Sequence, residues 1–216
     1  MATMRVGLVG CGNIASDICL AVRDRDIPAE VVALTDIDVS RAEALRNDNK
    51  LNACIGTLDE LAGAVDYIVE CAVAAVVPEV VDAAVRHGVD CLVMSVGGLL
   101  ERPELFDLAR RNNVSLWVPS GAICGIDGIR AAMHAGLDEV TLTTSKPPKG
   151  LKDAPYLRDK GIDLEGLTEP LVVFEGTARD AVRAFPANIN VAASLSLAGL
   201  GPDRTRVRLV ADPGTT

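Results

Sequence analysis

Residues 5–15 read Arg5-Val6-Gly7-Leu8-Val9-Gly10-Cys11-Gly12-Asn13-Ile14-Ala15, and this stretch decides the fold. Its apolar run from Val6 to Val9 has the length and β-branching of a buried parallel strand. The small residues that follow turn the chain directly into a helix. Strand, glycine-rich turn and helix in immediate succession are typical of a domain that binds a dinucleotide.

Each small residue of the turn has a separate role. Gly10 permits the tight bend, Gly12 lets a pyrophosphate approach the bare backbone, and Ala15 lets helix and strand pack closely. The first-turn amides, including those of Asn13 and Ile14, are expected to point at the phosphates from the positive end of the helix. The expected apolar face of this helix consists of Ile14, Ala15, Ile18, Cys19 and Val22.

A second apolar run, Val31 to Thr35, ends in Asp36, about 20 residues further on, where an acid can bind the ribose diol of adenosine. The alternative for Asp36 is a helix N-cap or an ordinary turn acid. An acid here also repels a 2′-phosphate, so NAD is expected in preference to NADP. Asp38 strengthens this repulsion, and Arg41 partly relieves it.

The composition fits a globular α/β protein. Of the 216 residues 49% are hydrophobic and only 3% aromatic, which suits layered packing of aliphatic side chains. The net charge of −9 argues against a nucleic-acid partner. We expect no membrane span, because no apolar run approaches the ~20 residues that one needs. No secretion signal is recognisable, which favours a cytoplasmic protein.

Cysteine and histidine give no sign of a metal site. The six cysteines form no Cys-x-x-Cys pair and mostly fall within strand or helix patterns, as small buried residues do in a reducing compartment. The two histidines, His87 and His134, lie in unrelated settings. We therefore expect no bound metal.

Strands alternate with helices as far as Val118, which predicts a Rossmann-type doubly wound parallel sheet. We place the domain boundary at Pro119, so that residues 1–119 form a dinucleotide-binding domain. Ligands of such sheets lie beyond the carboxyl ends of the strands. The loop after Cys71 and the loop from Ser95 to Gly98 are expected at that edge.

The few strands and interspersed helices expected in residues 120–216 predict a smaller α+β domain for substrate binding and dimerisation. A small-residue loop from Ser120 to Gly125 leads into it, and residues 152–170 are expected to form a polar loop. The last strand, Arg206 to Ala211, is expected at the edge of an open sheet. A chain that stops just after an edge strand suggests a C-terminally incomplete sequence, and an open sheet favours a homodimer.

Several motifs outside the nucleotide turn resemble L-aspartate dehydrogenases. They are Pro119-Ser120-Gly121-Ala122-Ile123-Cys124-Gly125-Ile126-Asp127-Gly128, Thr143-Thr144-Ser145-Lys146-Pro147-Pro148, Phe174-Glu175-Gly176-Thr177-Ala178, Phe185-Pro186-Ala187-Asn188-Ile189-Asn190-Val191-Ala192-Ala193 and Val210-Ala211-Asp212-Pro213. The resemblance implies oxidative deamination of L-aspartate with NAD or NADP, through iminosuccinate to oxaloacetate and ammonia, and a possible link to NAD biosynthesis. It also implies that Ala122 and an asparagine, Asn188 or Asn190, contact the nicotinamide half of the cofactor.

The resemblance further implies that the catalytic histidine lies in an Asn-x-His segment beyond Thr216. No catalytic residue is therefore expected within these 216 residues, which should bind cofactor but turn over little substrate. Neither His87 nor His134 matches that segment. A second departure from the family is Ser145, where we expect arginine in many members. If that arginine helps to hold a substrate carboxylate, specificity for aspartate does not follow from the resemblance here.

The chemistry of the side chains distinguishes the candidates for binding the nicotinamide and the substrate. Asn190 is the first candidate for the nicotinamide, since its amide can both donate and accept, whereas Asn188 fits a helix N-cap. Lys146 is either a solvated lysine or the cation that holds a substrate carboxylate, with Thr143 and Thr144 as possible support.

Two other functions remain open at this point. One is another NAD(P)-dependent oxidoreductase of a small carboxylate, similar to homoserine dehydrogenase. The other is a dinucleotide-binding protein without chemistry, because the family's catalytic histidine is absent from the sequence.

Overall fold

The computed structural model describes residues 3–121, 123–186 and 189–215. The chain divides into two compact units, Met1–Pro119 and Ser120–Thr216. None of the helices in the described ranges has the length and apolarity that a bilayer crossing requires.

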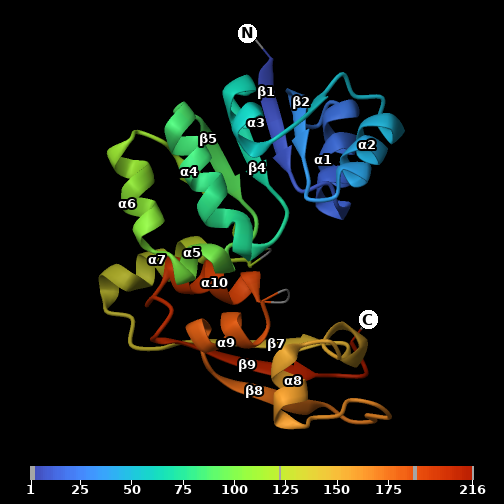
Figure 1. Ribbon diagram of the computed structural model, residues 1–216. Helices are drawn as coiled ribbons and strands as arrows, with labels where there is room; N and C mark the ends of the chain where they lie inside the picture. Colours follow the sequence, from blue (N-terminus) through green and yellow to red (C-terminus); the bar gives the residue numbers. More distant parts are fainter. Residues whose placement is uncertain (1–2, 122, 187–188, 216) are drawn as a thin grey trace. The chain divides into compact units, whose positions relative to one another are not determined.

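The first unit is built on a sheet of six parallel strands (Figure 1). They are β1 (Met4–Val9), β2 (Ala29–Thr35), β3 (Cys54–Ile55), β4 (Tyr67–Glu70), β5 (Asp90–Val93) and β6 (Leu116–Trp117). Their order in the sheet, β3-β2-β1-β4-β5-β6, reverses direction between β1 and β4. Because this is the strand order of dinucleotide-binding sheets, the predicted Rossmann-type doubly wound fold is confirmed.

Helices connect these strands. They are α1 (Asn13–Arg23), α2 (Val39–Asp48), α3 (Leu58–Ala64), the 3-10 turn η1 (Ala74–Val76), α4 (Val77–His87), α5 (Gly97–Glu101) and α6 (Glu104–Arg111). Local signals explain their ends. The Asp38 side chain accepts the backbone N–H of Ser40 at the start of α2, and Thr57 and Glu60 form a reciprocal capping box at α3.

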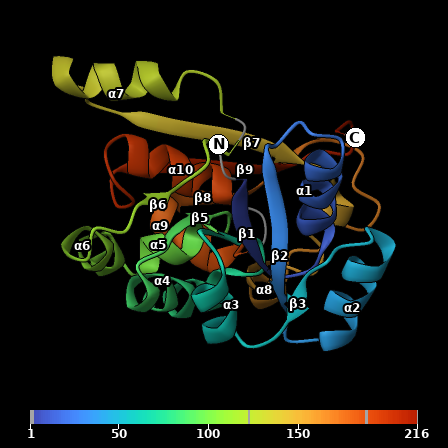
Figure 2. The same cartoon turned by 90° about the horizontal axis from the view of Figure 1, so that it is seen from above.

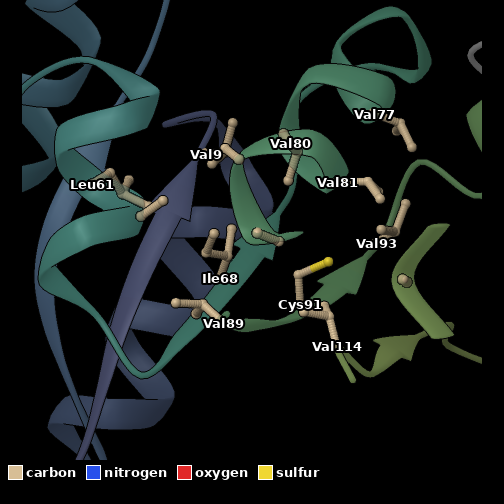
Figure 3. Packing of buried hydrophobic residues seen from close by; sticks show 14 of the residues in the cluster. Val9, Leu61, Ile68, Val77, Val80, Val81, Val89, Cys91, Val93 and Val114 are labelled. Atoms are coloured by element: carbon tan, nitrogen blue, oxygen red, sulfur yellow. The ribbon is translucent and has the colours of Figure 1, made fainter. Parts of the chain in front are cut away.

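The helices cover both faces of the sheet and bury a separate core on each. One core contains β-strand residues together with Leu61 of α3 and with Val77, Val80 and Val81 of α4 (Figure 3). The other packs Ala15 and Cys19 of α1 and residues of α2 against the opposite face. Removal of this aliphatic surface from water is the main term that stabilises the unit.

The loop expected from Ser95 to Gly98 is only partly a loop, because α5 begins at Gly97. A Cβ placed on Gly98 would lie 2.5 Å from the carbonyl oxygen of Ala74 and 2.8 Å from Val77. Glycine therefore occurs here because α5 packs closely against the backbone of η1, and the predicted loop is corrected to a short turn that enters α5 at Gly97.

The second unit contains a mixed sheet of three strands, β7 (Val140–Lys146), β8 (Leu171–Thr177) and β9 (Thr205–Ala211). The last strand, β9, runs parallel to β7 and antiparallel to β8, and it lies between them. The prediction that this strand forms a sheet edge is therefore wrong. Its alternation of buried Val207 and Leu209 with exposed Arg206 and Arg208 fits a central strand with only one covered face equally well.

Helices of the second unit are α7 (Ile126–Ala135), the 3-10 turn η2 (Pro148–Gly150), α8 (Pro155–Lys160), α9 (Ala178–Ala184) and α10 (Asn190–Ala198). Figure 2, which draws the whole chain from above, labels α7, α8, α9 and α10. The helix α8 lies within residues 152–170, which were expected to form a loop. Pro155 at its first turn, buried Leu157 and left-handed Gly161 at its C-cap specify this short helix.

Candidate functional site

A cavity of about 760 Å³ opens at the carboxyl ends of the strands in the first unit. Its walls come from the turn after β1, the end of β2, the loop after β4 and the start of α4. It is lined by Val9, Gly10, Cys11, Gly12, Asn13, Ile14, Thr35, Asp36, Ile37, Arg41, Leu58, Cys71, Ala72, Val73, Val76, Glu79 and Val80. Its size and its place at the point where the strand order reverses fit a nucleotide.

Position 10 requires glycine both because of its backbone conformation and because a neighbouring residue lies very close. Its φ of +91° lies in the left-handed region. A Cβ at this position would lie 2.7 Å from the Cα and 2.8 Å from the backbone nitrogen of Ala72. The close approach of the loop after β4, together with the turn itself, therefore excludes any side chain at Gly10.

Gly12 is different, because nothing in the protein demands a glycine there. Its φ of −92° and ψ of −158° suit any residue. A Cβ on Gly12 would meet no other part of the described chain within 4 Å. Since a methyl group would point into open space at the cavity wall, this glycine is explained by a ligand that lies against the backbone.

The N-terminus of α1 adds donors to this wall. Gly12 is its N-cap residue, and no side chain of the described residues caps the helix. The first-turn N–H groups are therefore available to an anion, at the positive end of an eleven-residue helix. These residues fit the pyrophosphate of a dinucleotide.

Asn13 and Ile14 line the same cavity. Ile14 was also expected on the buried face of α1, but the structure leaves it exposed, whereas Ala15 and Cys19 are fully buried. The helix packs through its small residues, which bring it close to the sheet, and this rotates the larger Ile14 towards the cavity.

Asp36 follows β2 and lies in the wall of the cavity. Its Oδ2 accepts the backbone N–H of Cys11 over 2.7 Å, and its Oδ1 accepts the N–H of Asp38 over 2.9 Å. The carboxylate thus holds the glycine-rich turn in addition to facing the cavity. Because each carboxylate oxygen has further lone pairs, hydroxyl donors of a ribose can still bind. The N-cap of α2 is Asp38, and Arg41 also lines the cavity.

Two thiols border the turn and are chemically inert near neutral pH. Burial raises the pKa of Cys11 to about 11 and that of Cys71 to about 12. The Cys71 thiol donates to the carbonyl oxygen of Gly10 over 3.2 Å. Both side chains therefore pack and brace the turn, and neither is a nucleophile.

Sequence reasoning missed Glu70, the last residue of β4. It is completely buried, and its carboxylate accepts hydrogen bonds from the backbone N–H of Ala72 and from both the N–H and the hydroxyl of Ser95. Burial raises the pKa of this carboxyl, and the hydrogen bonds from Ser95 and Ala72 oppose the rise. The available signal was an acid that ends an otherwise apolar strand at the ligand edge.

In the second unit, the small-residue loop meets the start of α10. A Cβ on Gly121 would lie 3.3 Å from the Cα of Val191 and 3.3 Å from the Ser194 hydroxyl. Asn190, the first residue of α10, is half-buried next to this contact. Ala122 and Asn188 lie outside the described residues, and the N-cap position of α10 is occupied by Ile189.

Lys146 ends β7 and is half-buried. Side chains two residues apart share a face of a strand, so Thr144 lies on the face of Lys146, whereas Thr143 and Ser145 lie on the opposite, exposed face. Thr143 therefore cannot support Lys146, but Thr144 can. Among the described residues, the Lys146 ammonium group makes no hydrogen bond or ion pair.

The histidines do not contribute to the cavity. His87 at the end of α4 places Nε2 3.0 Å from Oδ1 of Asp59, and His134 lies exposed in the last turn of α7. No cluster of three metal-ligating side chains occurs in the ranges that the structure describes.

Comparisons with known proteins agree with this geometry. Residues 10–119 match the family model described as homoserine dehydrogenase, NAD binding domain, and residues 127–216 match the model described as aspartate dehydrogenase, C-terminal. An L-aspartate dehydrogenase of Methanosarcina mazei is 47% identical over 216 residues, which cover 97% of this chain and 79% of that protein. The chain belongs to the aspartate dehydrogenase family.

Further aspartate dehydrogenases support the assignment. The enzyme of Bradyrhizobium diazoefficiens is 42% identical over 213 residues, or 99% of this chain and 76% of that protein. The crystal structure of aspartate dehydrogenase from Thermotoga maritima superposes with a TM-score of 0.74 at 26% identity, covering 99% of this chain and 81% of that chain. The family resemblance stated from the motifs is thus confirmed.

Among the cofactor residues predicted from the sequence, the structure brings five together. Gly10, Gly12, Asn13, Ile14 and Asp36 line a single cavity. Their contacts with a cofactor stay predictions, as do those of Asn190 and Lys146, which lie in the second unit.

Proposed function

We infer that this chain is an NAD(P)-dependent L-aspartate dehydrogenase, which deaminates L-aspartate oxidatively to iminosuccinate and then to oxaloacetate and ammonia. One structural observation carries the cofactor part: a Cβ on Gly12 would project into open space beside the uncapped N-terminus of α1. Family membership carries the choice of substrate, since the M. mazei and B. diazoefficiens relatives are named L-aspartate dehydrogenases. On the same resemblance we also propose that the iminosuccinate formed supplies NAD biosynthesis.

The cofactor, when bound, accepts a hydride from the α-carbon of the substrate. In this proposal the backbone amides of Asn13 and Ile14 bind its pyrophosphate. The Asp36 carboxylate accepts hydrogen bonds from the hydroxyl groups of its adenosine ribose. The exposed apolar side chains of Ile37 and Val73, both in the cavity wall, would be covered by the adenine ring. Ala122, Asn190 and Asn188 are proposed for the nicotinamide half.

NAD is proposed as the preferred cofactor. Asp36 lies in the cavity wall and Asp38 follows it at the start of α2, so a 2′-phosphate would meet two carboxylates. Arg41 lines the same cavity and offsets part of this repulsion, which leaves NADP as a weaker ligand.

Lys146 is proposed to bind one carboxylate of the substrate. A dicarboxylate needs a local positive charge in a protein whose net charge is −9. Lys146 is half-buried and its ammonium group has no internal partner among the described residues, so a substrate carboxylate would supply one. Oxidation also requires a base that takes a proton from the substrate ammonium group.

The experiment combines cofactor binding with a substrate panel. Protein expressed from the complete gene is titrated with NADH by nicotinamide fluorescence and then assayed at 340 nm with NAD and single amino acids. We expect reduction of NAD with L-aspartate and none with L-homoserine or L-alanine. NADH binding without aspartate-dependent reduction would contradict the proposed substrate, and no NADH binding would contradict the proposal as a whole.

A second candidate function is a related oxidoreductase of another small carboxylate. Two observations favour it: the first unit matches a homoserine dehydrogenase domain, and Ser145 stands where the resemblance leads us to expect an arginine in many aspartate dehydrogenases. Turnover of L-homoserine above that of L-aspartate in the same panel would decide for it.

We also propose a cytoplasmic homodimer. All six cysteines are unpaired thiols, as in proteins of reducing compartments. In the part of the second sheet that the structure describes, the outer strands β7 and β8 pair on one side only, and such edges are commonly covered. Light scattering coupled to size-exclusion chromatography tests the dimer: a mass twice that of the chain supports it, and the mass of one chain contradicts it.

A further inference from the structure

A buried carboxylate, Glu70, ties together two loops at the cofactor edge of the sheet. It ends β4, the strand that lies between β1 and β5, and its side chain is 0% exposed. Its Oε1 accepts the backbone N–H of Ala72 over 2.8 Å and the Ser95 hydroxyl over 2.9 Å. Its Oε2 accepts the backbone N–H of Ser95 over 2.8 Å. One side chain therefore fixes the first residues after β4 and after β5.

The loop after β4 is part of the proposed cofactor site. Ala72 is exposed in the cavity wall, although its N–H points inwards to Glu70. Its backbone lies so close to Gly10 that a Cβ on that glycine would come within 2.8 Å of the Ala72 nitrogen. The position of the Ala72 peptide thus limits where the glycine-rich turn can lie.

The hydrogen-bond pattern specifies glutamate and excludes its closest replacement. Each carboxylate oxygen faces a backbone N–H, so both oxygens must accept. Glutamine has one oxygen and one NH2 group. Whichever way its amide is turned, the NH2 group faces an N–H donor, either that of Ala72 or that of Ser95, and one backbone group loses its partner.

Burial of a carboxylate is costly, and an apolar residue would avoid that cost only by leaving the N–H groups of Ala72 and Ser95 without their acceptors. Sheet packing alone therefore does not explain Glu70. We propose that Glu70 is a positioning residue for the dinucleotide: through Ala72 and Ser95 it holds the loops after β4 and β5 in the arrangement that the glycine-rich turn requires. This inference rests on the proposed dinucleotide binding.

The test compares Glu70→Gln with Val114→Ala, a core truncation in the same unit that alters no polar contact of the cavity. Dissociation constants for NADH and ADP-ribose are measured well below the melting temperature of each variant. We expect Glu70→Gln to weaken both ligands about tenfold, as for one lost hydrogen bond to a charged group, and Val114→Ala to change them less than about twofold. ADP-ribose is included because it lacks the nicotinamide. If Glu70→Gln weakens the binding of NADH and of ADP-ribose equally, the effect lies at the glycine-rich turn and not at the nicotinamide.

Amide hydrogen exchange in the unsubstituted protein provides a second measurement, which stands even if Glu70→Gln does not fold. The Ala72 N–H should exchange slowly, although the residue is exposed, because its acceptor is buried. Equal dissociation constants for Glu70→Gln and the unsubstituted protein would overturn the inference, as would exchange of Ala72 at the rate of an unstructured peptide. Failure of the unsubstituted protein to bind NADH would overturn the proposed function itself, and the inference with it.

Discussion

The backbone N–H of Cys11 donates a hydrogen bond to Oδ2 of Asp36 over 2.7 Å. The middle residue of the Gly10-Cys11-Gly12 turn is thereby fixed to the acid at the end of the neighbouring strand. The two interpretations of Asp36, as an acid that stabilises the turn and as an acid that binds the ribose, are therefore compatible. Its two carboxylate oxygens can accept hydrogen bonds from the turn and from a ribose at the same time. The same carboxylate would shape the phosphate site and bind the sugar.

Asp36→Asn should weaken NADH binding about tenfold, because the amide cannot accept at both former oxygen positions. It should also lower the ratio of the dissociation constants for NADPH and NADH, since one of the charges that repel a 2′-phosphate is removed. Fluorescence titration with both cofactors measures this. Asp24→Asn, which removes a surface carboxylate paired with Arg23, serves as the control and should change neither value. An unchanged NADPH to NADH ratio in Asp36→Asn would remove Asp36 from the ribose site.

Lys146→Met should raise the KM for L-aspartate at least about tenfold, as expected for loss of a charge-assisted hydrogen bond to a carboxylate, and leave the NADH dissociation constant unchanged. Steady-state kinetics with varied aspartate measures the effect. Lys149→Met, in the neighbouring turn η2, is the matched control and should behave like the unsubstituted protein. Equal KM values for Lys146→Met and the control would show that Lys146 is a solvated lysine.

The thiols give a prediction about pH. Burial raises the pKa of Cys11 to about 11, so about 0.1% of this thiol is thiolate at pH 8. As the pH rises towards that pKa, the thiolate fraction increases about tenfold for each pH unit. Iodoacetamide at pH 8 should therefore modify exposed Cys54 and Cys124 and spare Cys11 and Cys71. Mass spectrometry of proteolytic peptides measures the modification at each site. Labelling of Cys11 as fast as that of Cys54 would contradict the burial of the turn.

Thr205 at the start of β9 is fully buried, and its hydroxyl has no hydrogen-bond partner among the described residues. Thr205→Val should therefore keep or raise the free energy of unfolding, by up to about 1 kcal/mol, since an unsatisfied hydroxyl is removed from the interior. Urea denaturation measures this. Ser196→Ala is the control, because the Ser196 hydroxyl is buried but donates to the carbonyl oxygen of Ala193 over 2.9 Å. A loss of stability in Thr205→Val larger than that in Ser196→Ala would indicate a partner for Thr205.

The first unit was largely predictable because its signals are local. Alternating strands and helices, the Gly10-Cys11-Gly12 turn and the acid after β2 lead directly to the parallel sheet and its cavity. Parallel strands joined by right-handed crossovers leave few topologies, so a correct pattern gave a correct fold.

Failures occurred where the answer depends on contacts distant in sequence. The strand β9 comes last in the chain but pairs between β7 and β8, which no local pattern shows. Ile14 follows the apolar period of α1 but faces the cavity, because the small Ala15 and Cys19 form the buried contact. Glu70 was overlooked because its three donors come from the loops after β4 and β5.

Substitution of Gly12 by alanine tests the central claim, that a dinucleotide lies against the turn after β1, most directly. Its φ and ψ and the open space around its Cβ predict that Gly12→Ala melts within about 1 °C of the unsubstituted protein and binds NADH at least about tenfold more weakly. Gly10→Ala, which places a Cβ 2.7 Å from the Ala72 backbone, is the contrasting variant and should lose several degrees of melting temperature. A Gly12→Ala protein with the stability and the NADH dissociation constant of the unsubstituted protein would contradict the account.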